Sequence, residues 1–226
     1  MHATDATIGA GSRMTANATP PKPKALCVVK DNIPPELRAW LQWVLWHLED
    51  RNPTDDKPTK VPYQINGAKA KANDPSTWTD FNCIWDRYQR GGYDGIGFMF
   101  SEDDDFCGID LDGCRDPKTG VVAEWACEII NRFRTYTEVS PSGTGVKLFA
   151  CGKSPLLSGK NKKLTDTKPI NGKTPGIEVY DHKRYFAVTG RRATAPDQSP
   201  CLTARAIEFH SAARNAYRAG SLELLK

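Results

Sequence analysis

The sequence predicts an α+β fold, in which helices pack on a sheet of mixed strand order. Short apolar runs typical of strands alternate with segments whose large apolar residues recur at helical spacing. These segments do not follow one another in regular strand–helix–strand order, which argues against a parallel sheet built from such units. No repeat of fixed period is visible, so solenoids and propellers are excluded.

The first predicted elements lie between residues 34 and 65. A short amphipathic helix opens at 34–35, because proline is preorganised for the first helical turn. The run 43–46, Trp-Val-Leu-Trp, favours a strand, with a helix continuing to Arg51 as the alternative. Residues 60–65 alternate like a short strand before an Asn-Gly turn.

The middle elements surround an acidic turn. Thr79 or Asp80 is expected to cap a helix that ends at two consecutive glycines, 91–92. Residues 96–100 and 106–112 then form two apolar runs typical of strands, and the acidic turn separates them.

The last elements complete the alternation of helices and strands. Residues 123–133 carry Trp, Ile and Phe at helical spacing and predict a helix. Residues 136–150 and 177–189 each predict a pair of strands, and 203–217 predicts a final helix.

These elements divide the chain into three parts. Residues 1–30, rich in Ala, Thr, Gly and Pro, predict a disordered arm, 31–195 form the folded core, and 196–226 form a C-terminal helical segment. Apolar residues make up 39% of the chain and charged residues 26%, which is ordinary for a folded domain. No segment approaches the roughly 20 apolar residues of a membrane-spanning helix, and no secretory signal opens the chain, so we expect a cytoplasmic protein without membrane contact.

The seven cysteines do not suggest a stabilising framework. Their number is odd and no Cys-x-x-Cys pair occurs, so free thiols are expected. A zinc site formed by Cys107, Cys114 and His182 is the alternative.

The formal net charge of +4 hides two opposed segments. Residues 101–116 hold seven acidic residues against one basic residue, and residues 153–192 hold ten basic residues against three acidic ones. Such a separation is typical of a site that binds metal ions through carboxylates and polyphosphate or nucleic acid through basic side chains. A solvated acidic turn beside a flexible basic loop is the simpler interpretation of the charge runs alone.

The most informative motif is Ile-Asp-Leu-Asp-Gly at 109–113. In a strand, Asp110 and Asp112 point to the same face, whereas Ile109 and Leu111 point into the core. Two carboxylates on one face repel each other unless a cation neutralises them, so a divalent metal bound through oxygen ligands is expected. A solvated strand end is the alternative.

Three functional interpretations of this motif compete. An EF-hand fails, because Cys114 and Arg115 occupy positions that need an oxygen ligand and a glycine. A phosphatase of the haloacid-dehalogenase kind would use Asp110, but Cys114 replaces the threonine of its Asp-x-Asp-Gly-Thr motif. A two-metal nucleotidyl-transfer site needs a further carboxylate from another strand.

Two further motifs follow. The segment 140–147, Ser-Pro-Ser-Gly-Thr-Gly-Val-Lys, has glycines that allow the backbone to approach a phosphate, although it is neither a Walker A loop nor a dinucleotide fingerprint. Glu178 stands between apolar strand residues, where a carboxylate without a partner is costly to bury. Arg184 and Tyr185 follow it after a tight turn. Ordinary hairpins are the structural alternative for both segments.

In their joint order, these motifs resemble the catalytic core of the archaeo-eukaryotic primase superfamily, in the primase-polymerase (prim-pol) branch of phage and plasmid replication proteins. The resemblance spans about residues 40–190. It includes the runs 43–46, 60–63, 95–98, 109–112, 136–145 and 178–190. It implies an RNA-recognition-like antiparallel sheet with packed helices plus an attached N-terminal α/β module, with nucleotide and template bound between them.

The resemblance also implies roles for single residues. Asp110, Asp112 and Glu178 match the family's catalytic acids, which bind Mg²⁺ or Mn²⁺. The residues implied in nucleotide binding are Lys60, Ser142, Gly143, Gly145, Lys147, Arg184 and Tyr185. Lys147 stands where histidine is usual, and lysine can contact a triphosphate but is not a neutral acid or base near pH 7. Arg184 matches the family's phosphate contact and Tyr185 its sugar contact.

The implied function is that of a DNA primase and DNA polymerase domain, which transfers nucleotides from nucleoside triphosphates to a primer on a DNA template. A helicase or a helical accessory domain, supplied in trans or by a longer chain, is the implied partner. A non-catalytic module that binds nucleotide or nucleic acid is the alternative.

Overall fold

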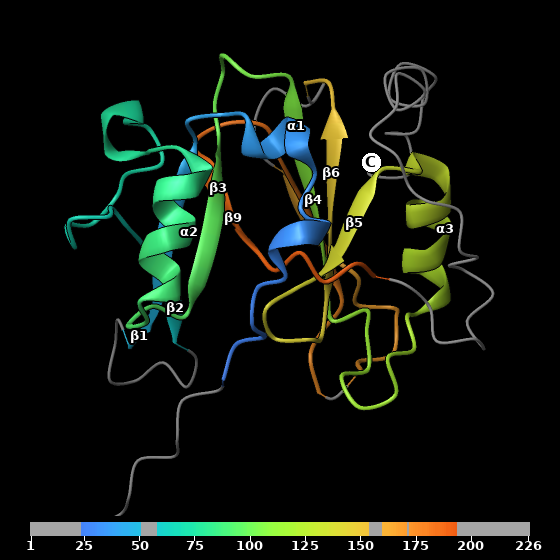
Figure 1. Ribbon diagram of the computed structural model, residues 1–226. Helices are drawn as coiled ribbons and strands as arrows, with labels where there is room; N and C mark the ends of the chain where they lie inside the picture. The colour runs from blue at the N-terminus through green and yellow to red at the C-terminus, as the bar shows by residue number, and fades with distance from the viewer. Residues whose placement is uncertain (1–23, 51–57, 154–159, 171, 194–226) are drawn as a thin grey trace, which may run out of the picture.

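The structure is a computed structural model (Figure 1). It describes residues 24–50, 58–153, 160–170 and 172–193. Most of the predicted arm, the predicted helical segment at 196–226 and the expected helix at 203–217 lie outside the described residues. No helix in the described part is long and apolar enough to cross a membrane.

The described strands form two antiparallel sheets, so the predicted α+β class is confirmed. Sheet A has the strand order β2-β1-β3-β9, and sheet B has the order β5-β6-β4-β8-β7. Sheet A consists of β1 (Trp43–Glu49), β2 (Thr59–Tyr63), β3 (Gly95–Phe100) and β9 (Arg184–Val188). Sheet B consists of β4 (Phe106–Asp112), β5 (Tyr136–Val139), β6 (Val146–Cys151), β7 (Lys160–Lys163) and β8 (Gly176–Tyr180). The helices are η1 (Lys30–Asn32), α1 (Pro35–Arg38), η2 (Pro75–Thr77), α2 (Phe81–Gln89) and α3 (Glu124–Phe133).

Sheet B separates two apolar clusters. Ile109 and Leu111 of β4 belong to the cluster formed with α3, which lies along the outer side of this sheet in Figure 1. Phe149 of β6 belongs instead to an aromatic cluster shared with sheet A, and its ring centroid lies 5.7 Å from that of Phe186 on β9. Because successive side chains of a strand point to opposite faces, Asp110 faces away from α3 and toward sheet A.

Helix α2 covers sheet A at β1. Its predicted N-cap is confirmed, since the Asp80 carboxylate accepts a hydrogen bond from the Cys83 N–H at 3.0 Å. Phe81 packs edge-on against Trp43 with ring centroids 4.8 Å apart. Residues 43–46 belong to strand β1 and pair with β3, so the strand is confirmed and the alternative helix is not formed.

The end of the predicted arm is part of the folded core. The Leu26 N–H donates to the Pro141 carbonyl at 2.9 Å, and the Val29 N–H donates to the Thr189 carbonyl at 2.8 Å. Residues 24–30 therefore do not belong to a disordered segment, because their backbone is paired with the core.

Three strands differ from the prediction: β8 and β9 lie in different sheets, and β7 was not predicted. The two strands predicted within 177–189 are not a hairpin, since β8 lies in sheet B and β9 in sheet A. Alternating apolar residues predict a strand but not its partner, which explains the error. Strand β7 has the sequence Lys-Asn-Lys-Lys, whose lack of apolar residues hid it. It is an edge strand, where such charged residues are common.

The expectation that the cysteines are free thiols is confirmed only in part. Free thiols are found at Cys27, Cys83, Cys107, Cys114 and Cys151, whereas Cys127 is disulfide-bonded. Within the described residues, no group of three or more His, Cys, Asp or Glu side chains is arranged to hold a metal ion, so the zinc alternative has no support.

Candidate active site

Strand register brings the predicted acids together. Asp110 on β4 lies directly opposite Glu178 on β8, and on its other side directly opposite Lys147 on β6. Direct partners in antiparallel strands point to the same face. Three of the predicted site residues therefore form one row across the middle of sheet B, on the face toward sheet A.

This row continues to both edges of sheet B. Glu138 on β5 lies opposite Lys147, and Asn161 on β7 lies opposite Glu178. We call Glu138, Lys147, Asp110, Glu178 and Asn161, one residue from each strand, the cross-strand row. Charged residues alternate in sign along its first three members, which reduces the cost of holding carboxylates on a partly buried sheet face.

Asp110 has one paired oxygen and one without a partner. Lys147 Nζ forms an ion pair with Asp110 Oδ2, and the same ammonium lies 4.0 Å from the centroid of the Phe186 ring. Asp110 Oδ1 is buried and has no hydrogen-bond partner within the described part of the chain. A buried carboxylate oxygen without a partner is costly, so it is a natural position for a cation ligand.

Asp112 lies at the end of β4 on the same face. Lys173 Nζ lies 2.7 Å from Asp112 Oδ1. Burial opposes ionisation of this carboxyl, but the hydrogen bond and the charge of Lys173 outweigh it, so the pKa of Asp112 is lowered. Asp112 is therefore an anion at neutral pH that already has a cationic neighbour.

Glu178 is held by two neutral donors. Asn161 Nδ2 donates to Glu178 Oε1, and the Tyr180 hydroxyl donates to Glu178 Oε2 at 3.2 Å. Because neither donor carries a charge, the carboxylate keeps its negative charge for another ligand. Neither donor was predicted, and Asn161 could not be, because β7 has no apolar pattern.

The opposite wall of the site belongs to sheet A. The Tyr185 hydroxyl on β9 donates to the Lys60 carbonyl on β2 at 2.8 Å, which fixes the aromatic ring beside this lysine. Burial, and next the charge of Lys147, lower the pKa of the Lys60 ammonium. The Arg184 guanidinium lies 5.0 Å from the Tyr180 ring centroid, in cation–π range.

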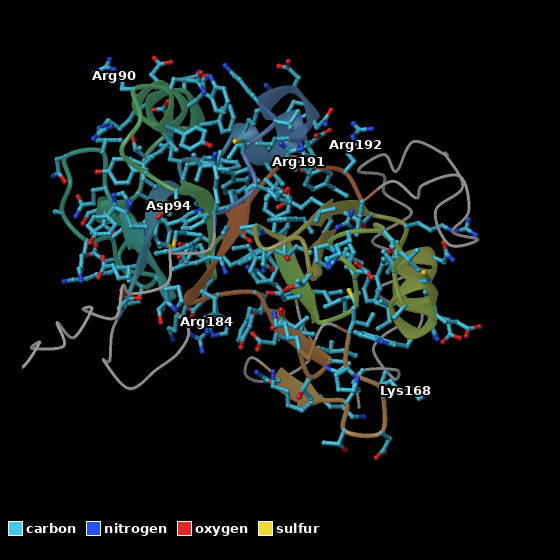
Figure 2. The ribbon with its side chains drawn as sticks, turned by 90° about the horizontal axis from the view of Figure 1, so that it is seen from below. Arg90, Asp94, Lys168, Arg184, Arg191 and Arg192 are labelled. Atoms are coloured by element: carbon cyan, nitrogen blue, oxygen red, sulfur yellow. The ribbon has the colours of Figure 1, made fainter. Side chains whose placement is uncertain are left out.

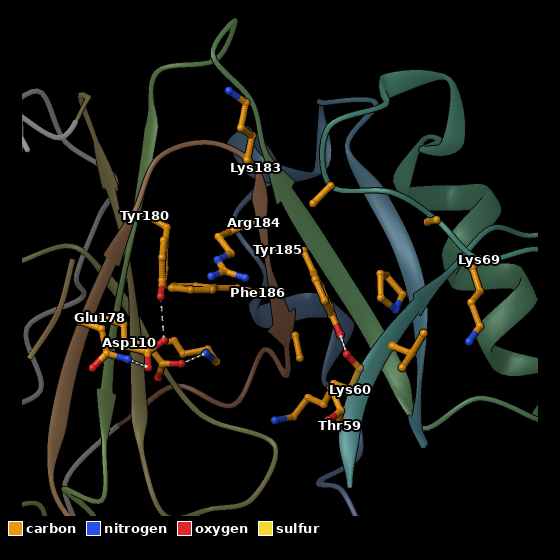
Figure 3. Close-up of a pocket in the computed structure, with 17 residues that line it drawn as sticks. Thr59, Lys60, Lys69, Asp110, Glu178, Tyr180, Lys183, Arg184, Tyr185 and Phe186 are labelled. Carbon is orange, nitrogen blue, oxygen red and sulfur yellow. Dashed lines mark hydrogen bonds and ion pairs between the residues drawn. The ribbon is translucent and has the colours of Figure 1, made fainter. Parts of the chain in front are cut away.

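A cavity of about 640 Å³ lies between the two walls. Figure 3 shows Asp110 and Glu178 on the sheet B side and Lys60 and Tyr185 on the sheet A side, with Arg184 between them. The predicted site residues that line it are Lys60, Asp110, Lys147, Glu178, Arg184 and Tyr185. This volume lies within the range of sites that bind small molecules.

The remaining predicted residues lie beside the cavity rather than in its lining. The loop that contains Ser142, Gly143 and Gly145 closes on itself, since the Ser140 hydroxyl accepts a hydrogen bond from the Gly145 N–H at 3.1 Å. It lies against the end of β4, because a Cβ on Gly145 would lie 3.5 Å from the Asp112 Cα. The loop therefore lies close to Asp112. Nucleotide binding by this loop remains a prediction.

The basic segment 153–192 does not form a single wall against the acids. Arg184 lies at the cavity, whereas Arg191 and Arg192 lie at the opposite side of the molecule in Figure 2, and Lys168 lies apart from both. The cations that do act on the acidic pair include Lys60 and Lys147, which precede the segment in the chain. The count of charges along the chain therefore overestimated the positive charge that residues 153–192 bring to the site and missed the contribution of Lys60 and Lys147.

No family model matches the chain. The chain is similar to the DNA primase-polymerase of Nitratiruptor phage NrS-1, with 35% identity over 155 residues. The matched region covers 68% of this chain and 20% of the phage protein, so the chain spans about a fifth of that relative's length. The phosphatase interpretation has no support from this comparison. This similarity confirms the predicted resemblance to primase-polymerases.

Proposed function

We propose that this domain is the nucleotidyl-transfer domain of a DNA primase-polymerase, which adds nucleotides to a primer paired with a DNA template. The observation that carries the proposal is the direct opposition of Asp110 and Glu178 across two strands, facing Lys60 and Tyr185 over a cavity of about 640 Å³. Carboxylates on one wall and cations on the other are the arrangement that a metal-bound triphosphate requires.

The cations have complementary positions for binding a triphosphate. Lys60 and Lys147 lie deep in the site, where a low dielectric strengthens their attraction for phosphate oxygens. Arg184 is exposed at the rim and free to present its planar group to a phosphate. Tyr185, whose hydroxyl donates to the Lys60 carbonyl, would contact the sugar.

Carboxylate oxygen is the ligand type that a hard divalent cation prefers, although the described acidic side chains are not arranged as a ready metal-binding group. Asp110, Asp112 and Glu178 would hold Mg²⁺ or Mn²⁺ through oxygen ligands, and the partnerless Asp110 Oδ1 supports that assignment. The bound metals would supply charge neutralisation at the reacting phosphate and activation of the primer hydroxyl. The protein's own residues contribute by orientation: Lys147 and Lys173 hold the two aspartates in place until a metal competes for them.

Primer extension and de novo priming assays test this proposal. Wild-type protein should incorporate nucleotides in a template-dependent reaction that requires Mg²⁺ or Mn²⁺, and Asp112→Ala should reduce incorporation by at least about 100-fold. Glu128→Ala, which removes an exposed carboxylate on α3, is the matched control and should behave like wild type. Wild-type activity in Asp112→Ala would overturn the assignment of the catalytic acids.

A non-catalytic binding module is the second candidate. It is favoured by the ion pairs of Asp110 with Lys147 and of Asp112 with Lys173, which neutralise both aspartates without any metal. In that case a labelled deoxynucleotide would bind to the wild-type protein, but no template would support its incorporation. A helicase or helical accessory partner remains a prediction for either function.

A further inference from the structure

We propose that Glu138 on β5 is a positioning residue, whose buried carboxylate fastens the end of the strand that carries Arg184 and Tyr185 to β5, the neighbour of the strand that carries Lys147. The proposal rests on the proposed function, because it assigns those three residues to nucleotide binding. Glu138 itself does not line the cavity.

The Glu138 carboxylate has an unusually complete set of donors. It is fully buried and accepts hydrogen bonds from the backbone N–H of Thr189 at 3.0 Å and of Gly190 at 2.9 Å. The Tyr136 hydroxyl adds a third hydrogen bond at 2.8 Å. Two successive backbone N–H groups that converge on one anion form a strong and directional anchor.

These donors mark the point where the chain crosses between the sheets. Strand β9 belongs to sheet A, but the residues that follow it pair with β5 of sheet B. The Val139 N–H donates to the Arg191 carbonyl at 2.7 Å, and the Ala193 N–H donates to the Thr137 carbonyl at 3.1 Å. Glu138 therefore binds the backbone at the crossing, directly after the strand that carries the nucleotide-contacting residues.

The crossing has little freedom to shift. Gly190 has φ of 62°, a conformation that residues with a side chain rarely adopt. A Cβ at this position would lie 2.1 Å from the Val29 carbonyl oxygen, so the N-terminal segment closes the other side. The Thr189 hydroxyl adds a hydrogen bond to the Val139 carbonyl at 2.6 Å. Small changes at Glu138 would therefore be transmitted to β9.

Glu138 also acts on the other nucleotide-binding strand. It lies opposite Lys147 in the cross-strand row, and Lys147 lies against Phe186 of β9. Burial raises the pKa of Glu138 to about 7, while its hydrogen bonds and the charge of Lys147 favour the anion. The Glu138 carboxylate on β5 therefore attracts the Lys147 ammonium from one side of β6, and Asp110 on β4 attracts it from the other side.

Equilibrium binding of a non-hydrolysable deoxynucleoside triphosphate with Mn²⁺ tests the proposal in Glu138→Gln. Glutamine keeps the shape but replaces one carboxylate oxygen by an NH₂ group, which cannot accept from a backbone N–H, so one of the two backbone hydrogen bonds and the negative charge are lost. We expect nucleotide affinity to fall about 10-fold; in a separate primer-extension assay of the same variant, KM should change more than kcat. Glu128→Gln on exposed α3 makes the same change of charge and should bind like wild type.

A double-mutant cycle separates positioning from a general loss of structure. If Glu138 acts through β9, Glu138→Gln and Arg184→Ala combined should weaken binding by less than the product of their separate effects. Multiplicative effects, or wild-type affinity in folded Glu138→Gln, would overturn the proposal. If Glu138→Gln does not fold, Thr189→Val removes the neighbouring hydroxyl contact and should weaken binding in the same direction, whereas unchanged binding contradicts the proposal. Because binding is measured without turnover, a protein that binds nucleotide but never incorporates it would refute the catalytic function and leave this test intact.

Discussion

Asp110 and Glu178 are direct partners on neighbouring antiparallel strands, although a helix and three strands separate them in the chain. Like charges placed directly opposite each other destabilise a sheet. Here each carboxylate has its own neutralising or hydrogen-bonding neighbour, Lys147 for Asp110 and Asn161 for Glu178. Two like charges therefore lie opposite each other at the position where a divalent cation is expected. Locally unfavourable pairings of this kind are typical of functional sites.

Replacement of Lys147 by methionine should reveal whether its ammonium competes with a metal for Asp110. Methionine keeps the apolar stem against Phe186 but removes the charge, which leaves the Asp110 carboxylate buried without a partner. The unfolding free energy without metal should fall by about 3 kcal/mol, the usual cost of breaking a buried ion pair.

Mn²⁺ should then stabilise Lys147→Met more than it stabilises wild type, because the metal would replace the lost cation. Thermal unfolding with and without Mn²⁺ measures this difference, and Lys118→Met, at an exposed position, is the control. Equal stabilisation of all three proteins would mean that the metal does not bind at Asp110.

The sequence predicted which face of β4 carries the acids better than it predicted the partners of the strands around them. Alternation placed Asp110 and Asp112 on one face, and the burial pattern of β4 agrees with that placement. The partners Asn161 and Lys173 were not predicted, because their roles arise only once strand register and loop closure are known. The position of β9 in the second sheet was also missed, since local pattern carries no information about partner choice.

Lys60→Met should weaken nucleotide binding without destabilising the fold. The pKa of Lys60 is lowered, first by burial and next by Lys147, so its charged form costs folding free energy at every pH below the lowered value. That cost disappears only as pH rises toward the unfolded value. At pH 7.5 the variant should therefore be at least as stable as wild type by urea unfolding.

Its affinity for a deoxynucleoside triphosphate should nevertheless fall about 10-fold, and the salt dependence of binding should decrease, because one phosphate contact is lost. Lys71→Met changes an exposed lysine and is the matched control. Unchanged affinity in Lys60→Met would remove this residue from the nucleotide site.

Tyr185→Phe should loosen the sheet A wall of the cavity. The change removes the hydrogen bond from the Tyr185 hydroxyl to the Lys60 carbonyl. Stability should fall by about 1 kcal/mol, the usual net value of one such bond, and the KM for nucleotide should rise a few-fold because the ring is no longer fixed. Denaturant unfolding and steady-state extension measure both effects. A lower kcat at unchanged KM would instead point to a role for the hydroxyl in the chemical step.

Glu138 should produce a pH-dependent stability difference that has the opposite sign to that of an ordinary paired carboxylate. Burial raises its folded pKa to about 7 from the ordinary value of 4.5, so ionisation costs folding free energy. This cost is absent below about pH 4.5 and complete above about pH 7. The groups that face it, Tyr136 and Lys147, are the same in wild type and in Glu138→Gln.

The unfolding free energy of wild type relative to Glu138→Gln should therefore fall by about 3 kcal/mol between pH 4.5 and pH 7, at about 1.4 kcal/mol for each unit of pKa. Urea unfolding of both proteins across this range measures the difference. Glu128→Gln, whose carboxylate is exposed, should differ from wild type by a nearly constant amount. A constant difference for Glu138→Gln as well would mean that its hydrogen bonds fully offset its burial, and that the carboxylate is ionised throughout.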